Sequence, residues 1–140
     1  MSNAVKWTAP INLSTGISSV TVNNGAGHLG SQYDNETNKY RFAAVSLTFQ
    51  HGTGPTGTWL VYILYATDGG TFEDGTSSVQ PAGTPYVIGT RAVTSQQRVS
   101  IPNIPLGPFL LRFLIWNDTG QNSSTTSVTL DAELYNEDIQ

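Results

Sequence analysis

The chain has 140 residues, no cysteine and a formal net charge of −4. This length is typical of one domain, and the lack of cysteine excludes disulfide bonds and thiolate metal sites. The six basic residues are scattered singly, which excludes the basic stripe of a nucleic-acid-binding surface.

Residues 1–16 are predicted to form an irregular N-terminal arm that carries Trp7, Ile11 and Leu13. The arm either packs back on its own domain or reaches a neighbouring molecule. Its first residues lack the apolar core of a signal peptide, and no stretch of the chain approaches the ~20 apolar residues of a membrane span. We therefore expect a protein made in a cytoplasm, with no membrane partner.

Residues 17–140 are predicted to form one β-sandwich domain. Short apolar runs are separated by Gly, Pro, Asn and Asp clusters, and no helical period is sustained. We expect strands at 18–23, 40–50, 58–66, 86–88, 98–101, 109–117 and 127–136, with an ordered, proline-rich turn at 102–108. Seven or eight strands without a helix predict an all-β, antiparallel sandwich of the jelly-roll kind.

Two of these strands are apolar on both faces, namely TWLVYILYA at 58–66 and FLLRFLIWN at 109–117. Such strands lie at the centre of a sheet and are covered on both sides. One cover is the opposite sheet, and the other is a loop, an arm or a second subunit. The last strand instead alternates, with Asp131, Glu133 and Tyr135 on its polar face.

Arg112 is the only charged residue in the second two-faced strand. A buried, unpaired guanidinium is very costly. We expect Arg112 either to pair with Asp131 or Glu133 or to emerge at a contact surface.

No residue pattern in the chain indicates an enzyme or a metalloprotein. His28 and His51 lie in glycine-rich loops without a ligand partner at metal-binding spacing, and no Gly-x-Ser-x-Gly motif is present. The acidic pairs Asp34/Glu36 and Glu73/Asp74 are better explained as turn residues than as calcium ligands. We expect no catalytic residue, no metal and no cofactor.

The chain is unusually poor in charge. Charged residues make up 11% of it, against about a quarter in average domains. Protein interfaces are depleted in Lys, Glu and Asp, so this composition favours a surface that is covered in an assembly. Exposed aromatic rings would instead suit a carbohydrate-binding module. Trp59 and Trp116 are expected in the core, which leaves Tyr135 as the better exposed candidate for such a site.

Several stretches together resemble small structural proteins of tailed-bacteriophage virions, in the manner of head decoration (cement) proteins. These stretches are YDNETN at 33–38, GTWLVYILYATDG at 57–69, FEDG at 72–75, IPLGPF at 104–109, LIWNDTG at 114–120 and TLDAELY at 129–135. The similarity covers about residues 30–137 and includes no catalytic motif.

The resemblance implies a β-sandwich without enzymatic activity, made in the bacterial host. It further implies a homo-oligomer, often a trimer, bound to the major capsid protein on the outer surface of the phage head. The candidate interface residues are Trp7, Ile11, Leu13, Arg112 and Tyr135. The alternatives are a tail, neck or fibre module of the same fold, and a carbohydrate-binding β-sandwich module.

Overall fold

A computed structural model describes residues 5–139 of the chain. Residues 1–4 of the predicted arm, and residue 140, lie outside the described residues. The elements are β1 (Val5–Trp7), β2 (Ile11–Leu13), β3 (Gly27–Leu29), β4 (Tyr33–Asp34), α1 (Asn35–Asn38), β5 (Phe42–Phe49), β6 (Thr58–Ala66), β7 (Tyr86–Ile88), β8 (Gln97–Pro105), β9 (Leu110–Asp118), β10 (Thr129–Tyr135) and β11 (Glu137–Ile139).

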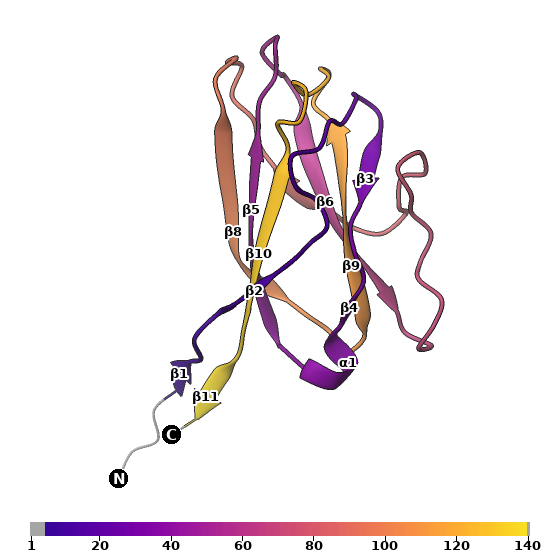
Figure 1. The fold of residues 1–140 in the computed structure, drawn as a ribbon, viewed down its shortest axis with the longest axis vertical. Coiled ribbons are helices and arrows are strands. Elements are labelled where there is room, and N and C mark those ends of the chain that lie inside the picture. Colours follow the sequence, from indigo (N-terminus) through magenta and orange to yellow (C-terminus); the bar gives the residue numbers. More distant parts are fainter. Residues whose placement is uncertain (1–4, 140) are drawn as a thin grey trace.

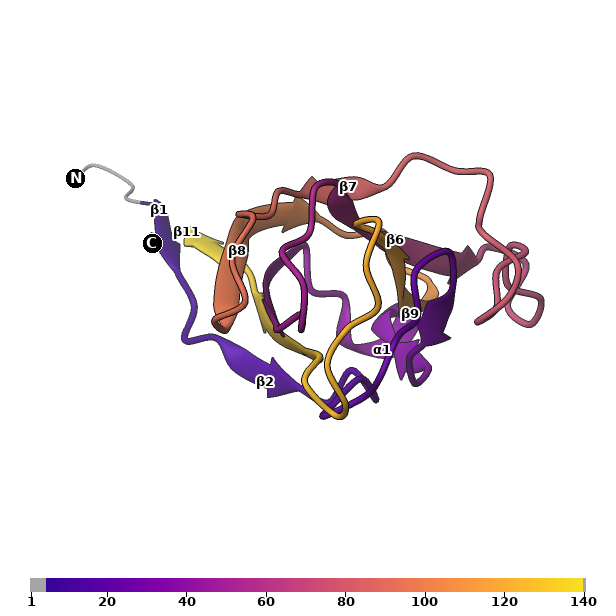
Figure 2. The same cartoon turned by 90° about the horizontal axis from the view of Figure 1, so that it is seen from above.

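The strands form two antiparallel sheets that pack face to face (Figures 1 and 2). One sheet has the order β2-β10-β5-β8. The other has the order β3-β9-β6-β7, with β4 also paired to β9. The prediction of an all-β, antiparallel sandwich is confirmed. The described helix, α1, is a single turn, and no described helix is long and apolar enough to cross a membrane.

The main core lies between the two sheets and follows from strand alternation. On β5, the inward side chains of Ala43, Val45, Leu47 and Phe49 are almost completely buried, and their neighbours are partly exposed. The inward side chains of β10 and Trp59 of β6 belong to the same cluster, together with side chains of β7, β8 and β9. The strand period of two therefore places one apolar row of each strand in this core.

A second, smaller core lies on the outer face of the five-stranded sheet. It contains Tyr62, Leu64, Leu114 and Trp116 of β6 and β9. The long segment 67–85 covers it, with Gln80 Nε2 donating to the Tyr62 hydroxyl (2.9 Å) and Phe72 packing against the cluster. Of the three covers that the sequence left open for the two-faced strands, the structure uses a loop of the same chain.

Two of the expected strands differ in the structure. Residues 18–23 form no strand, and only Val20 makes an isolated bridge, to Val128. The expected strand at 98–101 extends through Pro102 and Pro105 to form β8, because β8 is an edge strand, where prolines are tolerated. Helix α1 was not predicted, since four residues are too few to show a helical period.

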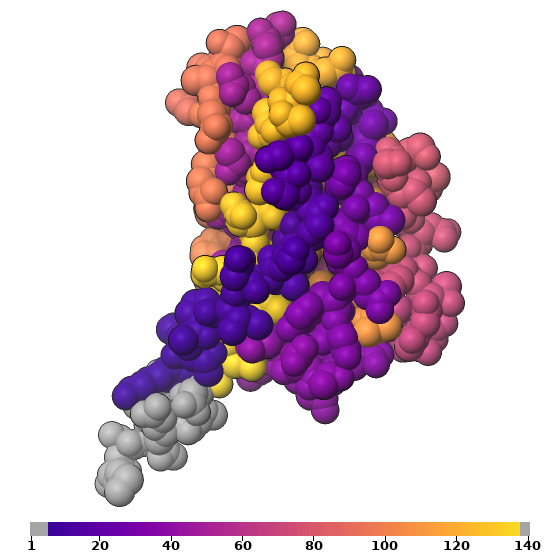
Figure 3. All heavy atoms as spheres, in the orientation of Figure 1, coloured from indigo at the N-terminus to yellow at the C-terminus, as the bar shows by residue number. Residues whose placement is uncertain are grey.

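The described part of the predicted arm takes part in the sheets. β2 pairs with β10 at the edge of the four-stranded sheet, and β1 pairs with β11 in a separate two-stranded ribbon. Two hydrogen bonds hold the ribbon at its base. The backbone N–H of Thr8 donates to the Asn136 carbonyl oxygen (2.9 Å), and the backbone N–H of Asn136 donates to the Thr8 hydroxyl (3.0 Å). The N-terminal segment runs along the outside of the molecule (Figure 3), and the β1–β11 ribbon projects from one end (Figure 1).

Candidate functional site

The outward-facing side chains of the four-stranded sheet form the most distinctive surface of the molecule, which we call the open face. Strand register sets its layout in rows across the sheet. One row contains Asn12, Glu133 and Ala44, and the next contains Asp131, Ser46 and Ser100. Side chains that are neighbours on one face of a sheet are close enough to act on the same ligand.

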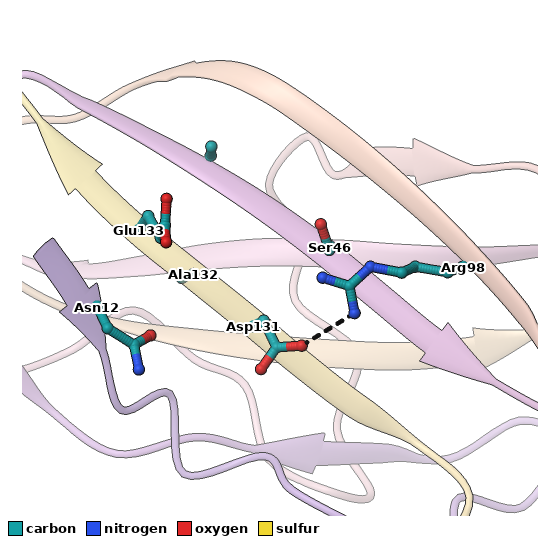
Figure 4. A pocket seen from close by; sticks show the side chains of 7 residues that line it. Asn12, Ser46, Arg98, Asp131, Ala132 and Glu133 are labelled. Carbon is teal, nitrogen blue, oxygen red and sulfur yellow. Dashed lines mark hydrogen bonds and ion pairs between the residues drawn. The ribbon is translucent and has the colours of Figure 1, made fainter. Parts of the chain in front are cut away.

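A hollow of about 410 Å³ lies in the middle of the open face. We call it the polar hollow; it is lined by Asn12, Ala44, Ser46, Arg98, Asp131 and Glu133 (Figure 4). Its cause is the size of the side chains. The central strand β5 contributes the short side chains of Ala44 and Ser46, whereas the neighbouring strands contribute longer ones. A polar trough therefore runs between β10 and β8.

The charges of the polar hollow are only partly paired. Arg98 donates to Asp131 Oδ2 (3.3 Å) and to the Thr48 hydroxyl (3.1 Å). Both members of the ion pair are more than half exposed, so the pair adds little stability. Within residues 5–139, no hydrogen bond or ion pair engages the carboxylate of Glu133 or the side-chain amide of Asn12. These two groups remain available to a ligand.

Three aromatic rings lie at the end of the open face nearest the termini; we call them the aromatic corner. Phe42 and Tyr135 are cross-strand neighbours and stack, with their centroids 5.4 Å apart. Trp7 packs edge-on against both, at 5.7 Å from Phe42 and 5.3 Å from Tyr135. Trp7 nevertheless remains 61% exposed. An aromatic ring that is held in place and still exposed is typical of a protein contact site.

The structure distributes the five predicted interface residues unevenly. Trp7 and Tyr135 meet in the aromatic corner, and Ile11 lies partly exposed on the adjoining edge strand β2. Leu13 points into the main core, so its side chain does not reach a partner. Tyr135 is on the predicted face but is only 8% exposed, and its hydroxyl lies 2.8 Å from the Pro102 carbonyl oxygen.

Arg112 lies on the other sheet, and the expected ion pair with Asp131 or Glu133 is wrong. Its Nε and one terminal nitrogen donate to the Gly30 carbonyl oxygen (3.1 and 2.8 Å). The guanidinium also stacks on Phe72, 5.3 Å from the ring centroid. Arg112 therefore helps to fix the segment 67–85. Arg98 makes the ion pair with Asp131 instead, a pairing that depends on the register of three strands.

Two acidic residues in turns, Asp34 and Asp68, accept hydrogen bonds from nearby backbone N–H groups. The Asp34 carboxylate accepts a hydrogen bond from the Thr37 hydroxyl (2.8 Å) and others from the backbone N–H groups of Thr37 and Glu36 (3.1 and 3.0 Å). These bonds lower the pKa of its carboxyl, and the bond from the hydroxyl contributes most. The Asp68 carboxylate accepts hydrogen bonds from the backbone N–H groups of Thr71 and Gly70 (2.8 and 3.0 Å), and these bonds lower the pKa of its carboxyl. Within residues 5–139, no three acidic, His or Cys side chains are placed to hold a metal ion.

Comparison with known proteins adds no relative, because no family model, curated protein or solved structure matches this chain. The geometry of the open face and the aromatic corner therefore carries the functional proposal.

Proposed function

We propose that this chain is a non-enzymatic virion protein, a decoration protein that attaches to the major capsid protein on the outside of a phage head. The observation that carries the proposal is the exposure of Trp7 above two further aromatic rings. Tryptophan and tyrosine supply a large share of the binding energy in protein interfaces. The aromatic corner would be the anchor of the attachment.

The aromatic corner is organised before any partner binds. Trp7 is held by edge contacts to Phe42 and Tyr135, and the backbone N–H of the next residue, Thr8, donates to the Asn136 carbonyl oxygen. Ordering a side chain on binding costs free energy, and a ring that is already held avoids much of that cost. Ile11 on β2 is partly exposed as well, but it pairs with the core residue Leu134 and so lies on the opposite face of the sheet from Tyr135.

We further propose that copies of the chain associate, as a trimer or another homo-oligomer. The low charge content of the sequence supports this, and so does the projecting β1–β11 ribbon, because two-stranded ribbons are marginally stable alone. The two-faced strands lend no support, since segment 67–85 covers them. A protein that binds only the assembled shell would stabilise it by mass action.

A pair of matched variants tests the attachment. Trp7→Ala removes the exposed ring of the aromatic corner, and Val87→Ala removes a side chain of similar exposure (60%) from β7 of the other sheet. We expect Trp7→Ala to weaken binding to purified phage heads that lack this protein by more than tenfold, the size of an interface hot spot. Val87→Ala should bind like the wild type, and both variants should remain folded by circular dichroism.

Unchanged binding of Trp7→Ala, or no binding of the wild-type chain to heads, would overturn the proposed function. The location on the virion has a separate test, because a tail, neck or fibre module could use the same corner. Electron microscopy of virions that carry a tag on this chain should show labelled heads. Labelling confined to tails would place the protein there instead.

A further inference from the structure

We infer that the polar hollow is a binding site for a neutral saccharide, distinct from the attachment anchor at the aromatic corner. The hollow is a concave, hydrogen-bonding surface at Ala44, where the β5–β8 register shifts between Ala43 and Val45. Its volume of about 410 Å³ falls within the usual range for small-ligand sites, about 300–1,000 Å³. This inference does not depend on the proposed attachment to a phage head.

The floor and walls of the hollow suit a ring that carries hydroxyl groups. Ala44 on the floor offers an apolar surface to the C–H groups of a sugar ring. The walls carry acceptors on Asp131 and Glu133, donors on Arg98, and groups that do both on Asn12 and Ser46. A hydroxyl group donates one hydrogen bond and accepts others, so a mixed wall matches a polyol better than a wall of one kind.

Glu133 and Asn12 are the residues most clearly free to bind. Glu133 on β10 and Asn12 on β2 are direct cross-strand neighbours, and no partner engages either side chain within residues 5–139. One offers carboxylate oxygens and the other offers an amide, so together they can hold two adjacent hydroxyl groups of one sugar ring. Hydrogen bonds to a charged group are the stronger kind, which makes Glu133 the main contributor to affinity.

Most other ligand classes fit this hollow poorly. Two carboxylates against one guanidinium leave it negative, which disfavours anions, including acidic sugars. A metal ion lacks a ligand set within the described residues. A basic side chain of a protein would find one uncompensated carboxylate, Glu133, because Asp131 is already paired with Arg98; it is the rival ligand that the test includes. An apolar ligand would leave the polar walls without partners.

The test uses the full-length chain and a panel of free neutral sugars, namely glucose, galactose, mannose, N-acetylglucosamine, maltose, cellobiose and lactose. Glucuronic acid, sialic acid and arginine amide serve as charged comparators. Isotope-labelled protein is titrated and followed by NMR. We expect at least one neutral sugar to shift the backbone signals of Asn12, Ala44 and Ser46, and to bind better than the acidic sugars.

Two variants locate the site. Glu133→Gln keeps the size of the side chain and should weaken binding at least about tenfold, which corresponds to about 1.4 kcal/mol. Ala44→Leu fills the trough and should abolish binding without changing its charge. Glu36→Gln on α1 is the matched control for charge, and Trp7→Ala separates this site from the attachment anchor. Both should bind the sugar like the wild type, and melting curves establish that every variant is folded.

Three results would overturn the inference. The first is the absence of binding to any neutral sugar at about 10 mM, a concentration at which even millimolar affinities are detected. The second is sugar binding that neither Glu133→Gln nor Ala44→Leu changes. The third is binding of arginine amide with no sugar binding, which would assign the hollow to a basic protein side chain. Loss of head attachment alone would leave the saccharide site intact.

Discussion

The indole N–H of Trp59 donates a hydrogen bond to Nε2 of His51 inside the main core (3.3 Å). Both side chains are fully buried. Because Nε2 accepts this bond, the imidazole proton is on Nδ1, which donates to the Asn122 carbonyl oxygen (2.9 Å). His51 therefore links β6 to the loop that precedes β10. His51, which the sequence placed in a glycine-rich loop without a partner at metal-binding spacing, is a buried residue that holds two parts of the fold together.

Replacing His51 with leucine should destabilise the fold by about 2–6 kcal/mol. Leucine leaves the Trp59 N–H and the Asn122 carbonyl without their partner, and each buried group left unsatisfied costs about 1–3 kcal/mol. Chemical denaturation of the wild type and the variant measures the difference. His28→Leu is the control, because His28 is only half-buried and should cost much less. Equal losses for the two variants would contradict the structural role of His51.

Elements governed by local alternation could be predicted from the sequence. The expected strand at 58–66 coincides with β6, and the expected strand at 109–117 differs from β9 by one residue at each end. The polar and apolar faces of 127–136 also match β10. In these segments, side-chain period and β-propensity point to the same structure.

Features that depend on long-range pairing could not be predicted. The polar hollow needs four strands in register, and nothing local to Asn12 indicates that it lies beside Glu133. The partner of Arg112 is a backbone carbonyl, which carries no sequence signal. Two of the three rings of the aromatic corner, Trp7 and Tyr135, are candidates from the sequence, whereas Phe42 is not.

Gly30 should not tolerate even the smallest side chain. A Cβ atom there would lie 2.3 Å from the Thr15 carbonyl oxygen and 2.9 Å from that of Phe113, and both are backbone atoms that cannot move freely. We expect Gly30→Ala to cost about 1–3 kcal/mol, as overpacking does in a core. Gly52→Ala, whose Cβ would meet nothing within 4 Å, should leave the midpoint of denaturation almost unchanged. A tolerated Gly30→Ala would show that the close approach of these backbones is not required.

Arg112 should be irreplaceable by lysine, although both residues are basic. Its planar guanidinium donates two hydrogen bonds to Gly30 and stacks on Phe72, and an ammonium group reproduces neither arrangement. We expect Arg112→Lys to cost about 1–2 kcal/mol of unfolding free energy. Hydrogen exchange in 67–85 should also become faster. Arg98→Lys is the matched control, because its exposed ion pair with Asp131 is worth less than about 1 kcal/mol.

Acid should weaken the turn at Asp34. Hydrogen bonds from Thr37 and from the α1 backbone hold the pKa of the Asp34 carboxyl below its ordinary value. A carboxyl whose pKa is lowered by folding stabilises the fold above its unfolded pKa of about 3.9, and this contribution is lost as the pH falls through the folded pKa. Urea denaturation from neutral to acidic pH measures the loss.

Asparagine caps a helix about as well as aspartate but does not titrate. We therefore expect Asp34→Asn to match the wild type near neutral pH and to lose less stability as the pH falls below about 4. The pKa of Asp68 is lowered by the backbone N–H groups of Thr71 and Gly70, so Asp68→Asn should flatten the acid limb further in the double variant. If the wild type and the double variant lose the same unfolding free energy as the pH falls below about 4, neither carboxylate is better stabilised in the folded chain than in the unfolded one.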